Sequence, residues 1–347
     1  MYEGRKKRGG QKHRRRCAAL LCAFALAVCL LAACGGAESS SSSPGVSISG
    51  NYAFKIDGET CSLAEAKVFL LNYQNQCREI YGMDLSSDNV QTNSELETYI
   101  KDLTISQLAE IYMLNLLAKD RGTSLTEEEE ANAAAAAEAY YASLNEAETE
   151  YLGISESKLE ALYGKYALAQ KVYQEITDGV DDEVSDDDAR VVSLQQILVA
   201  DADTAQEGYA SLENGEEFSV LAAKYNEASE TSFYADRFDF DDETEEIIFS
   251  LSTGSYTEVI VAEEGYCIYY CVNAFMEEMT EENKSVVLET RICEALDAAY
   301  AAYDGSLSVD LNEEKWDEVE VSMDPELQTQ DFFDIYQEYC QAEEEDV

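Results

Sequence analysis

Histidine is almost missing from this chain of 347 residues, because its single example, His13, lies in a basic N-terminal stretch that we expect to be removed. Without imidazole, the mature chain cannot form a Ser/His/Asp or Cys/His site, which excludes those hydrolases. The sequence also has no Cys-x-x-Cys motif, phosphate-binding loop or nucleophile elbow. Two carboxylates could still act as a general acid and a general base. With so many acidic residues, however, the spacing in the sequence does not identify which two.

Basic residues are the second shortage. The chain has 23 Lys and Arg against 72 Asp and Glu; residues 1–33 hold 8 of the bases and one acid, leaving 15 against 71, or −56. Such a surface repels nucleic acid and anionic lipid headgroups, so neither is expected as a partner. It suits a solvated exterior, and it would attract basic, unfolded polypeptides.

Thiols are scattered, and we expect neither a metal nor a cofactor. A zinc site would need four thiolates from distant positions. Cys267 and Cys271 would lie roughly 13 Å apart along one strand, too far to bridge. A Cys61–Cys77 disulfide stays open, whereas most thiols are expected to be free in the core. Besides Cys34, the cysteines after the leader are Cys61, Cys77, Cys267, Cys271, Cys293 and Cys340.

Residues 1–33 have the pattern of a signal peptide. Eight basic residues precede an apolar stretch, residues 17–33, that is short for a membrane-spanning helix. The stretch ends Leu31-Ala32-Ala33-Cys34, which resembles a bacterial lipobox and implies a lipid on Cys34. A secretion signal cleaved without lipid and a retained anchor are the alternatives. Residues 34–50, with five consecutive serines, predict a flexible tether.

Residues 51–180 predict a strand and four helices. The strand covers residues 52–56, and Ser62 and Glu65 form a capping box that opens the first helix. The second helix covers about residues 94–120 and the fourth about 155–176. The third starts at Thr126 and runs through an alanine block toward Leu152. Their apolar stripes need partners, which indicates a helical domain.

An acidic segment, residues 181–188, follows this part of the chain. It has enough carboxylates for calcium but lacks the glycine at which an EF-hand loop turns. We therefore interpret it as a solvated linker rather than as a calcium site.

Residues 189–274 predict a small α+β domain. Residues 191–199 alternate as a strand, and three short helices follow, of which the first stops at Asn214-Gly215 and the last ends near Phe249. Two strands, at residues 256–261 and 266–272, close the unit. Helices packed on an antiparallel sheet are the expected architecture.

This order resembles the parvulin family of peptidyl-prolyl isomerases, on four matching pieces: Gln196-Ile197-Leu198-Val199, Asn214-Gly215-Glu216-Glu217-Phe218, Phe249-Ser250-Leu251 and Glu264-Gly265-Tyr266-Cys267-Ile268. The resemblance places the two histidines of the family at Gln196 and Cys267, which would be the catalytic positions. It places the proline-binding residues at Phe238, Phe240, Thr244 and Phe249. The reaction itself needs only an apolar pocket that favours a twisted amide. Both a slow isomerase and a scaffold without catalysis therefore stay open.

Residues 275–321 predict a helix capped by Thr280 and a strand near residue 309, and residues 322–347 form a mixed aromatic and acidic tail. A helical domain made from both ends of the chain, with a parvulin module inserted, is similar to PrsA-like foldase lipoproteins and to SurA. The resemblance implies a membrane-anchored extracytoplasmic foldase for unfolded exported proteins, and it leaves a homodimer open. The alternative is a non-catalytic protein-binding lipoprotein on the same scaffold.

Overall fold

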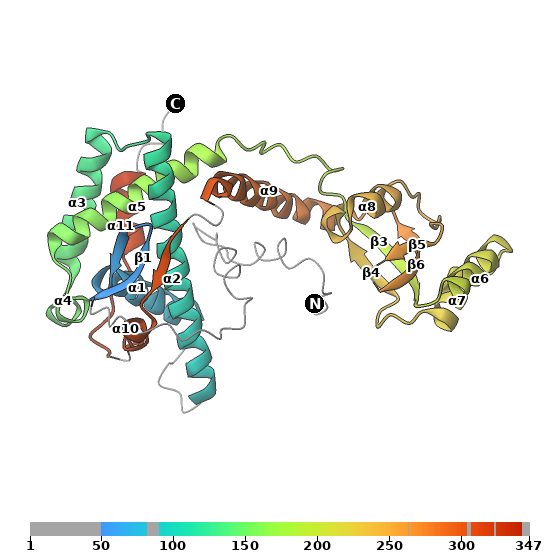
Figure 1. The fold of residues 1–347 in the computed structure, drawn as a ribbon, viewed down its shortest axis with the longest axis horizontal. Helices are drawn as coiled ribbons and strands as arrows, with labels where there is room; N and C mark the ends of the chain where they lie inside the picture. The colour runs from blue at the N-terminus through green and yellow to red at the C-terminus, as the bar shows by residue number, and fades with distance from the viewer. Residues whose placement is uncertain (1–49, 82–89, 263, 304–306, 323, 342–347) are drawn as a thin grey trace. The chain divides into compact units, whose positions relative to one another are not determined.

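The computed structural model describes residues 50–341, apart from residues 82–89, 263, 304–306 and 323 (Figure 1). The described residues form two compact units: a central unit, Asp181–Ile292, and a helical unit made of the residues before and after it. Helix α9, Glu277–Tyr300, begins in the central unit and ends in the helical unit. Within these ranges, no helix has both the length and the apolar character needed to cross a bilayer.

A three-stranded antiparallel sheet joins the two ends of the chain within the helical unit. β1, Tyr52–Ile56, lies between β2, Glu59–Ser62, and β7, Val309–Leu311. Asp57 and Gly58 both take positive φ angles, 48° and 84°, as the tight hairpin between β1 and β2 requires. The predicted strands at residues 52–56 and near residue 309 are confirmed.

The other elements of this unit are helices and one 3-10 turn. Those before the central unit are α1 Leu63–Tyr81, α2 Val90–Arg121, α3 Glu127–Ser143, α4 Glu146–Leu152 and α5 Glu156–Thr177. Those after it are the end of α9, a 3-10 turn Ala301–Tyr303, α10 Glu313–Asp317 and α11 Phe332–Cys340. α5 packs against both α2 and α3, and α11 packs against α3. Segments far apart in sequence therefore share one core.

Phe332, at the start of α11, lies in the middle of an aromatic core. It is fully buried, and its ring centroid lies 4.2 Å from that of Tyr163 and 5.1 Å from that of Phe69. Its backbone N–H donates to Asn72 at 3.1 Å, and the Tyr163 hydroxyl donates to its carbonyl at 2.9 Å. The segment predicted as a mixed aromatic and acidic tail thus supplies a central core residue. The acidic side chains of α11 are exposed, whereas Phe332 and Tyr336, which lie one helical turn apart, are buried.

The predicted helix from Thr126 to Leu152 is wrong in one respect, because it is two helices. α3 begins with the expected Thr126 capping box and ends after Ser143. Asn145 then accepts from the Glu148 N–H at 2.9 Å, and the Glu148 carboxylate accepts from the Asn145 N–H at 2.9 Å. This second capping box starts α4, so the capping side chains override the helix propensity of the alanine block.

The central unit is built on a four-stranded antiparallel sheet with the strand order β4-β3-β6-β5. Its elements, in chain order, are β3 Val192–Val199, α6 Ala202–Glu213, α7 Phe218–Tyr225, β4 Ser232–Ala235, a 3-10 turn Arg237–Asp239, α8 Asp242–Phe249, β5 Ile260–Ala262 and β6 Gly265–Asn273. Gly215 ends α6 with a φ of 92°, as the sequence predicts. The α+β class is confirmed.

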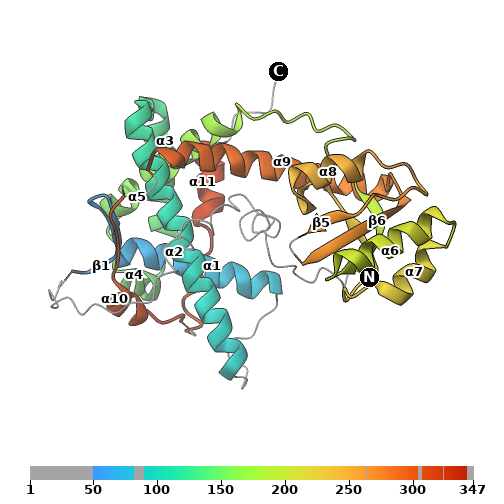
Figure 2. The same ribbon diagram turned by 45° about the vertical axis from the view of Figure 1, so that its right-hand side comes forward.

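Helices cover both faces of this sheet (Figures 1 and 2). On one face, Ile197, Val199 and Ile268 pack with side chains of α6 and α7. On the other face, which we call the α8 face, the strands pack with Ala235, Ile248 and Phe249. Because side chains alternate along a strand, the odd positions of β3 belong to the first face and the even positions to the α8 face.

Two local predictions for the central unit are corrected, and one strand was not predicted. The strand predicted at residues 256–261 is only a single bridge, from Tyr256 to Tyr270, followed by the short β5. β4 was missed. Thr280 does not cap α9 but lies inside it, fully buried, where its hydroxyl oxygen accepts from the Val191 N–H at 3.1 Å. In each case a contact from another part of the unit decides the local structure.

The acidic segment, residues 181–188, is exposed and ion-paired within the central unit. The described residues hold no group of three or more carboxylates, thiols or imidazoles placed to bind a metal ion. Four basic side chains lie against the segment instead, in the pairs Asp186–Lys284 at 2.7 Å, Asp187–Arg190 at 3.2 Å, Asp187–Arg237 at 2.7 Å and Asp188–Arg291 at 3.0 Å.

Candidate functional site

The two expected catalytic positions lie next to each other in the sheet. Gln196 on β3 pairs with Tyr269 on β6, and Cys267 on β6 pairs with Leu198 on β3. Cross-strand partners share a face, and residues two apart on one strand share it too, so Gln196 and Cys267 are diagonal neighbours on the α8 face. The structure therefore brings together the two positions that the resemblance selects.

Both side chains are inside the unit. Gln196 is 1% exposed and Cys267 is fully buried. The Gln196 side-chain amide donates to the Glu230 carbonyl at 2.7 Å, and its backbone N–H donates to the Thr231 carbonyl at 2.8 Å. Gln196 thereby fastens the segment before β4 to the sheet. Cys267 packs in the core with Leu194, Leu198 and other apolar groups.

Three of the expected proline-binding residues have structural roles, either at the start of a helix or turn or in the core. Thr244 is buried, and its backbone N–H and hydroxyl donate to the Asp241 carboxylate at 3.0 and 2.8 Å. Those hydrogen bonds hold the pKa of the Asp241 carboxyl below its usual range. Phe240 is partly buried against the α8-face core, edge-on to Tyr269 at 5.7 Å. Phe238 lies in the 3-10 turn, where its N–H donates to Asp236 at 3.0 Å.

A pocket of about 390 Å³ lies beside α8, and Phe249 is the one residue of the predicted set that lines it. The Arg190 and Arg237 guanidinium carbons lie 5.1 and 4.7 Å from the centroid of the Phe249 ring, within cation–π distance. Arg190 also donates to the Phe249 carbonyl at 2.8 Å. The remaining lining residues are Asp242, Glu245, Glu246 and Ser250. Neither Gln196 nor Cys267 lines this pocket.

The charges of this pocket are compensated. Arg237 is paired with Asp187 and Glu245, and Arg190 with Asp187. An aromatic wall with paired guanidinium groups can bind a peptide surface by stacking and hydrogen bonding. Neither arginine was predicted as a site residue from the sequence. The available signal was their scarcity, because basic residues are rare in this chain. Arg190 directly precedes the strand predicted at residues 191–199, and Arg237 follows the end of β4 by two residues.

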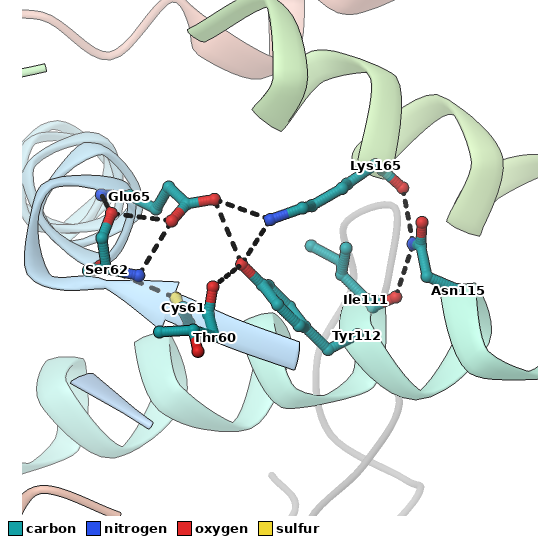
Figure 3. A network of polar contacts seen from close by, with 8 residues as sticks. All are labelled: Thr60, Cys61, Ser62, Glu65, Ile111, Tyr112, Asn115 and Lys165. Atoms are coloured by element: carbon teal, nitrogen blue, oxygen red, sulfur yellow. Dashed lines mark hydrogen bonds and ion pairs between the residues drawn. The ribbon is translucent and has the colours of Figure 1, made fainter. Parts of the chain in front are cut away.

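A second polar site lies in the helical unit, around Glu65 (Figure 3). The Lys165 ammonium lies 2.9 Å from the Glu65 carboxylate and 2.6 Å from the Tyr112 hydroxyl. Ser62 donates to the other Glu65 oxygen through its N–H and its hydroxyl, at 2.8 and 2.7 Å. Burial opposes charge on Glu65, but Lys165 and Ser62 outweigh it and hold the pKa of this carboxyl below its usual range.

Comparison with known proteins returns structures but no sequence family. No family model matches the chain, and no curated protein is significantly similar to it. The solved structures similar to it include a peptidylprolyl isomerase, PrsA, from Bacillus cereus, at 17% identity over 71% of this chain and 94% of that one, with a TM-score of 0.39. The foldase protein PrsA from Streptococcus pneumoniae is 15% identical over 74% and 98%, with a TM-score of 0.28.

A structure from a pair of SurA-like chaperones of Campylobacter jejuni is 13% identical, over 76% of this chain and 99% of that one, with a TM-score of 0.26. The structures that the chain resembles are thus PrsA-like and SurA-like foldase chaperones, the families that the sequence predicted. At this identity and TM-score, its function must be argued from its own residues.

Proposed function

We propose that this chain is a foldase or chaperone that binds unfolded, newly exported polypeptides. The observation that carries the proposal is the order of the two units along the chain: the contiguous sheet-and-helix unit, Asp181–Ile292, interrupts the sequence of a helical unit that is assembled from the residues before and after it. The resemblance to parvulin-containing foldases predicts this order. In this proposal residues 189–274 are the parvulin-like domain, and residues 51–180 and 275–321 form the chaperone domain.

The proposed location follows from the N-terminal sequence, which lies outside the described residues. Residues 1–33 would be removed, a lipid on Cys34 would hold the protein at the outer face of the bacterial cytoplasmic membrane, and residues 34–50 would be the tether. Labelling with a radioactive fatty acid tests this. We expect the label in the wild type and none in Cys34→Ser; a label that persists in the variant would contradict the lipid anchor.

Charge supports the choice of partner. With 71 acids and 15 bases after residue 33, the exported protein attracts basic unfolded chains at long range and repels nucleic acid. Two unfolded clients of one fold but opposite charge, reduced lysozyme and reduced α-lactalbumin, test both parts of the proposal. We expect the full chain to suppress aggregation of the basic client more strongly at low salt. If it suppresses aggregation of neither client, the chaperone proposal is wrong.

The burial of Gln196 and Cys267 favours the second candidate, a protein-binding lipoprotein without catalysis. A substrate amide cannot reach side chains that are this deeply buried, and the pocket beside α8 is lined by different residues. A protease-coupled assay of proline isomerisation with the full chain separates the candidates. We expect no acceleration from the wild type. Acceleration that is lost in Phe249→Ala would instead establish an isomerase whose pocket is the one beside α8.

A double variant examines the catalytic positions directly. If the family's chemistry has lapsed only through its histidines, Gln196→His with Cys267→His restores turnover. If the two side chains serve only the core, the double variant stays inactive and is less stable, because two larger rings enter a packed interior. Thermal unfolding measured beside the assay distinguishes these outcomes.

A further inference from the structure

The sheet of the helical unit has two outer edges, β2 and β7, because β1 lies between them. In an antiparallel ladder, successive residues turn their backbone groups alternately toward and away from the neighbouring strand. Two hydrogen bonds fix the phase of β7: Asp57 N–H to Ser308 C=O and Asn312 N–H to Ala53 C=O, both at 2.9 Å. The even-numbered residues of β7 therefore direct their backbone N–H and C=O groups toward β1. Val309 and Leu311 direct theirs away from β1, to the outer edge of the sheet.

The β2 edge is closed by the protein itself (Figure 3). The Tyr112 hydroxyl lies 3.1 Å from the outward Thr60 carbonyl, and the Ser62 N–H donates to the Glu65 carboxylate at 2.8 Å. Lys165 in turn holds both Tyr112 and Glu65. A foreign strand would have to break this buried network to pair with β2, so that edge is protected.

On the β7 edge, the described residues make no such hydrogen bonds to the outward backbone groups. Among the described residues, β7 pairs only with β1. The Val309 and Leu311 side chains are 55% and 38% exposed, although their cross-strand partners, Ile56 and Phe54, are buried. One short strand therefore presents outward backbone donors and acceptors together with two apolar side chains, the combination by which an extended peptide is added to a sheet.

The surroundings of this edge select the kind of segment. Asp57, Glu313 and Glu314 are exposed at the two ends of β7, and Asp310 lies within it. A second copy paired antiparallel at the same residues would place one Asp310 opposite another and would repeat the acidic ends, which is unfavourable. A segment that carries lysine or arginine complements these charges.

We propose that the outer edge of β7 binds unfolded clients by strand addition, taking an extended segment with alternating apolar residues flanked by lysine or arginine. This inference rests on the proposed chaperone function and deepens it by assigning a docking place and a sequence preference. Backbone pairing supplies affinity without a fixed sequence, while Val309 and Leu311 favour apolar positions.

The test uses the purified full chain and a short fluorescent peptide that alternates valine with lysine or threonine. Two N-methylated forms of the peptide are compared, each methylated on one of the two alternating sets of amides. Strand addition predicts that only the set facing β7 matters, so one form binds like the parent and the other binds much more weakly. Equal binding of both forms would overturn the proposal.

Variants locate the site. Val309→Pro removes an outward N–H and leaves the pairing of β7 with β1 in place, so we expect peptide affinity to fall at least about tenfold. Val309→Thr keeps the N–H and a β-branched side chain, and should bind within about threefold of wild type. Val261→Pro is the matched control, because Val261 is exposed on β5, an edge strand of the other sheet. Loss of binding in that control would place the site elsewhere and overturn the inference.

Amide exchange gives a readout that a merely weakened fold would not give. Without peptide, we expect the Val309 and Leu311 amides to exchange quickly and the Asp310 amide slowly; with peptide, all three should be protected. Sedimentation tests the rival occupant, since loss of a dimer in Val309→Pro without loss of peptide binding would assign the edge to a second copy. If Val309→Pro still suppresses client aggregation as wild type does, the edge proposal fails while the chaperone proposal stands.

Discussion

The two units differ in how their cores are closed. The central unit is made from one contiguous stretch, Asp181–Ile292. The helical unit is held together by contacts between residues far apart in the sequence. The Asn75 side chain donates to the Leu327 and Thr329 carbonyls, at 3.1 and 2.8 Å, and these residues lie more than 250 positions further along the chain. Contacts this distant in sequence cost more loop entropy before they form. Stability of the helical unit should therefore depend on residues at the C-terminal end, whereas that of the central unit should not.

Phe332→Ala should have the largest effect on this comparison. Removal of a fully buried ring from the aromatic core should lower the unfolding free energy of the helical unit by about 4 kcal/mol. Amide exchange should accelerate in α1 and α5 and stay unchanged in β3 and β6. Phe275→Ala, at a half-exposed site of the central unit, is the control and should cost less than about 1 kcal/mol. Equal acceleration in both units would refute the separation.

Lys165→Met should come next, at about 3 kcal/mol near neutral pH, because it leaves the Glu65 carboxylate buried without its cation. The folded-state pKa of Glu65 is lowered, so its contribution is present above its unfolded pKa and is lost as pH falls through the folded value. The gap between wild type and variant should therefore shrink in acid. Lys171→Met, whose partner Glu129 is exposed, should cost less than about 1 kcal/mol. Denaturant titrations at several pH values check both variants.

Glu110→Gln should stabilise the helical unit in a pH-dependent way. Both Glu110 oxygens are buried with no hydrogen-bond partner among the described residues, and burial raises the pKa of this carboxyl to about 8. The folded state keeps the proton that the unfolded chain releases above its ordinary pKa, so wild-type stability falls as pH rises from about 4.5 to about 8.

The neutral glutamine removes that fall, with little change at the acidic end and a gain on the order of 2 kcal/mol near pH 6 that increases further toward pH 8. The exposed Glu138→Gln is the control and should leave the slope unchanged. A stability difference between Glu110→Gln and wild type that does not vary with pH would show that Glu110 is charged throughout.

Gln196→Ala should have the smallest effect, and only in the central unit. It leaves the Glu230 carbonyl without the side-chain donor at 2.7 Å, at a cost of about 1 to 2 kcal/mol. Exchange in β3 and β4 should accelerate, and the amides of α1 and α5 should not respond. A variant as stable as wild type would show that Gln196 does not fasten the segment before β4.

Periodic and capped segments could be predicted from the sequence, and elements fixed by distant contacts could not. β3, α6 and the start of α3 follow from alternation, from the Asn214-Gly215 stop and from the Thr126 capping box. The second capping box, at Asn145, can also be recognised in the sequence, but the alanine block before it favours the prediction of one continuous helix. β4 has four residues and no pattern of its own, so only its pairing with β3 defines it.

The candidate site, too, could be predicted only in part from the sequence. Sequence resemblance selected Gln196 and Cys267, and register makes them neighbours, but their burial depends on packing across the sheet. Phe249 was selected as well, whereas Arg190 and Arg237 reach it only in the folded unit. The open edge at β7 needs three strands from two ends of the chain, which no local pattern reveals.

The position of Phe332 has a consequence for biosynthesis. A ribosome makes the chain from its N-terminus, so the central unit emerges complete before Phe332, whose ring packs between α1 and α5, has been made. Until α11 has been made, the core of the helical unit lacks the Phe332 ring.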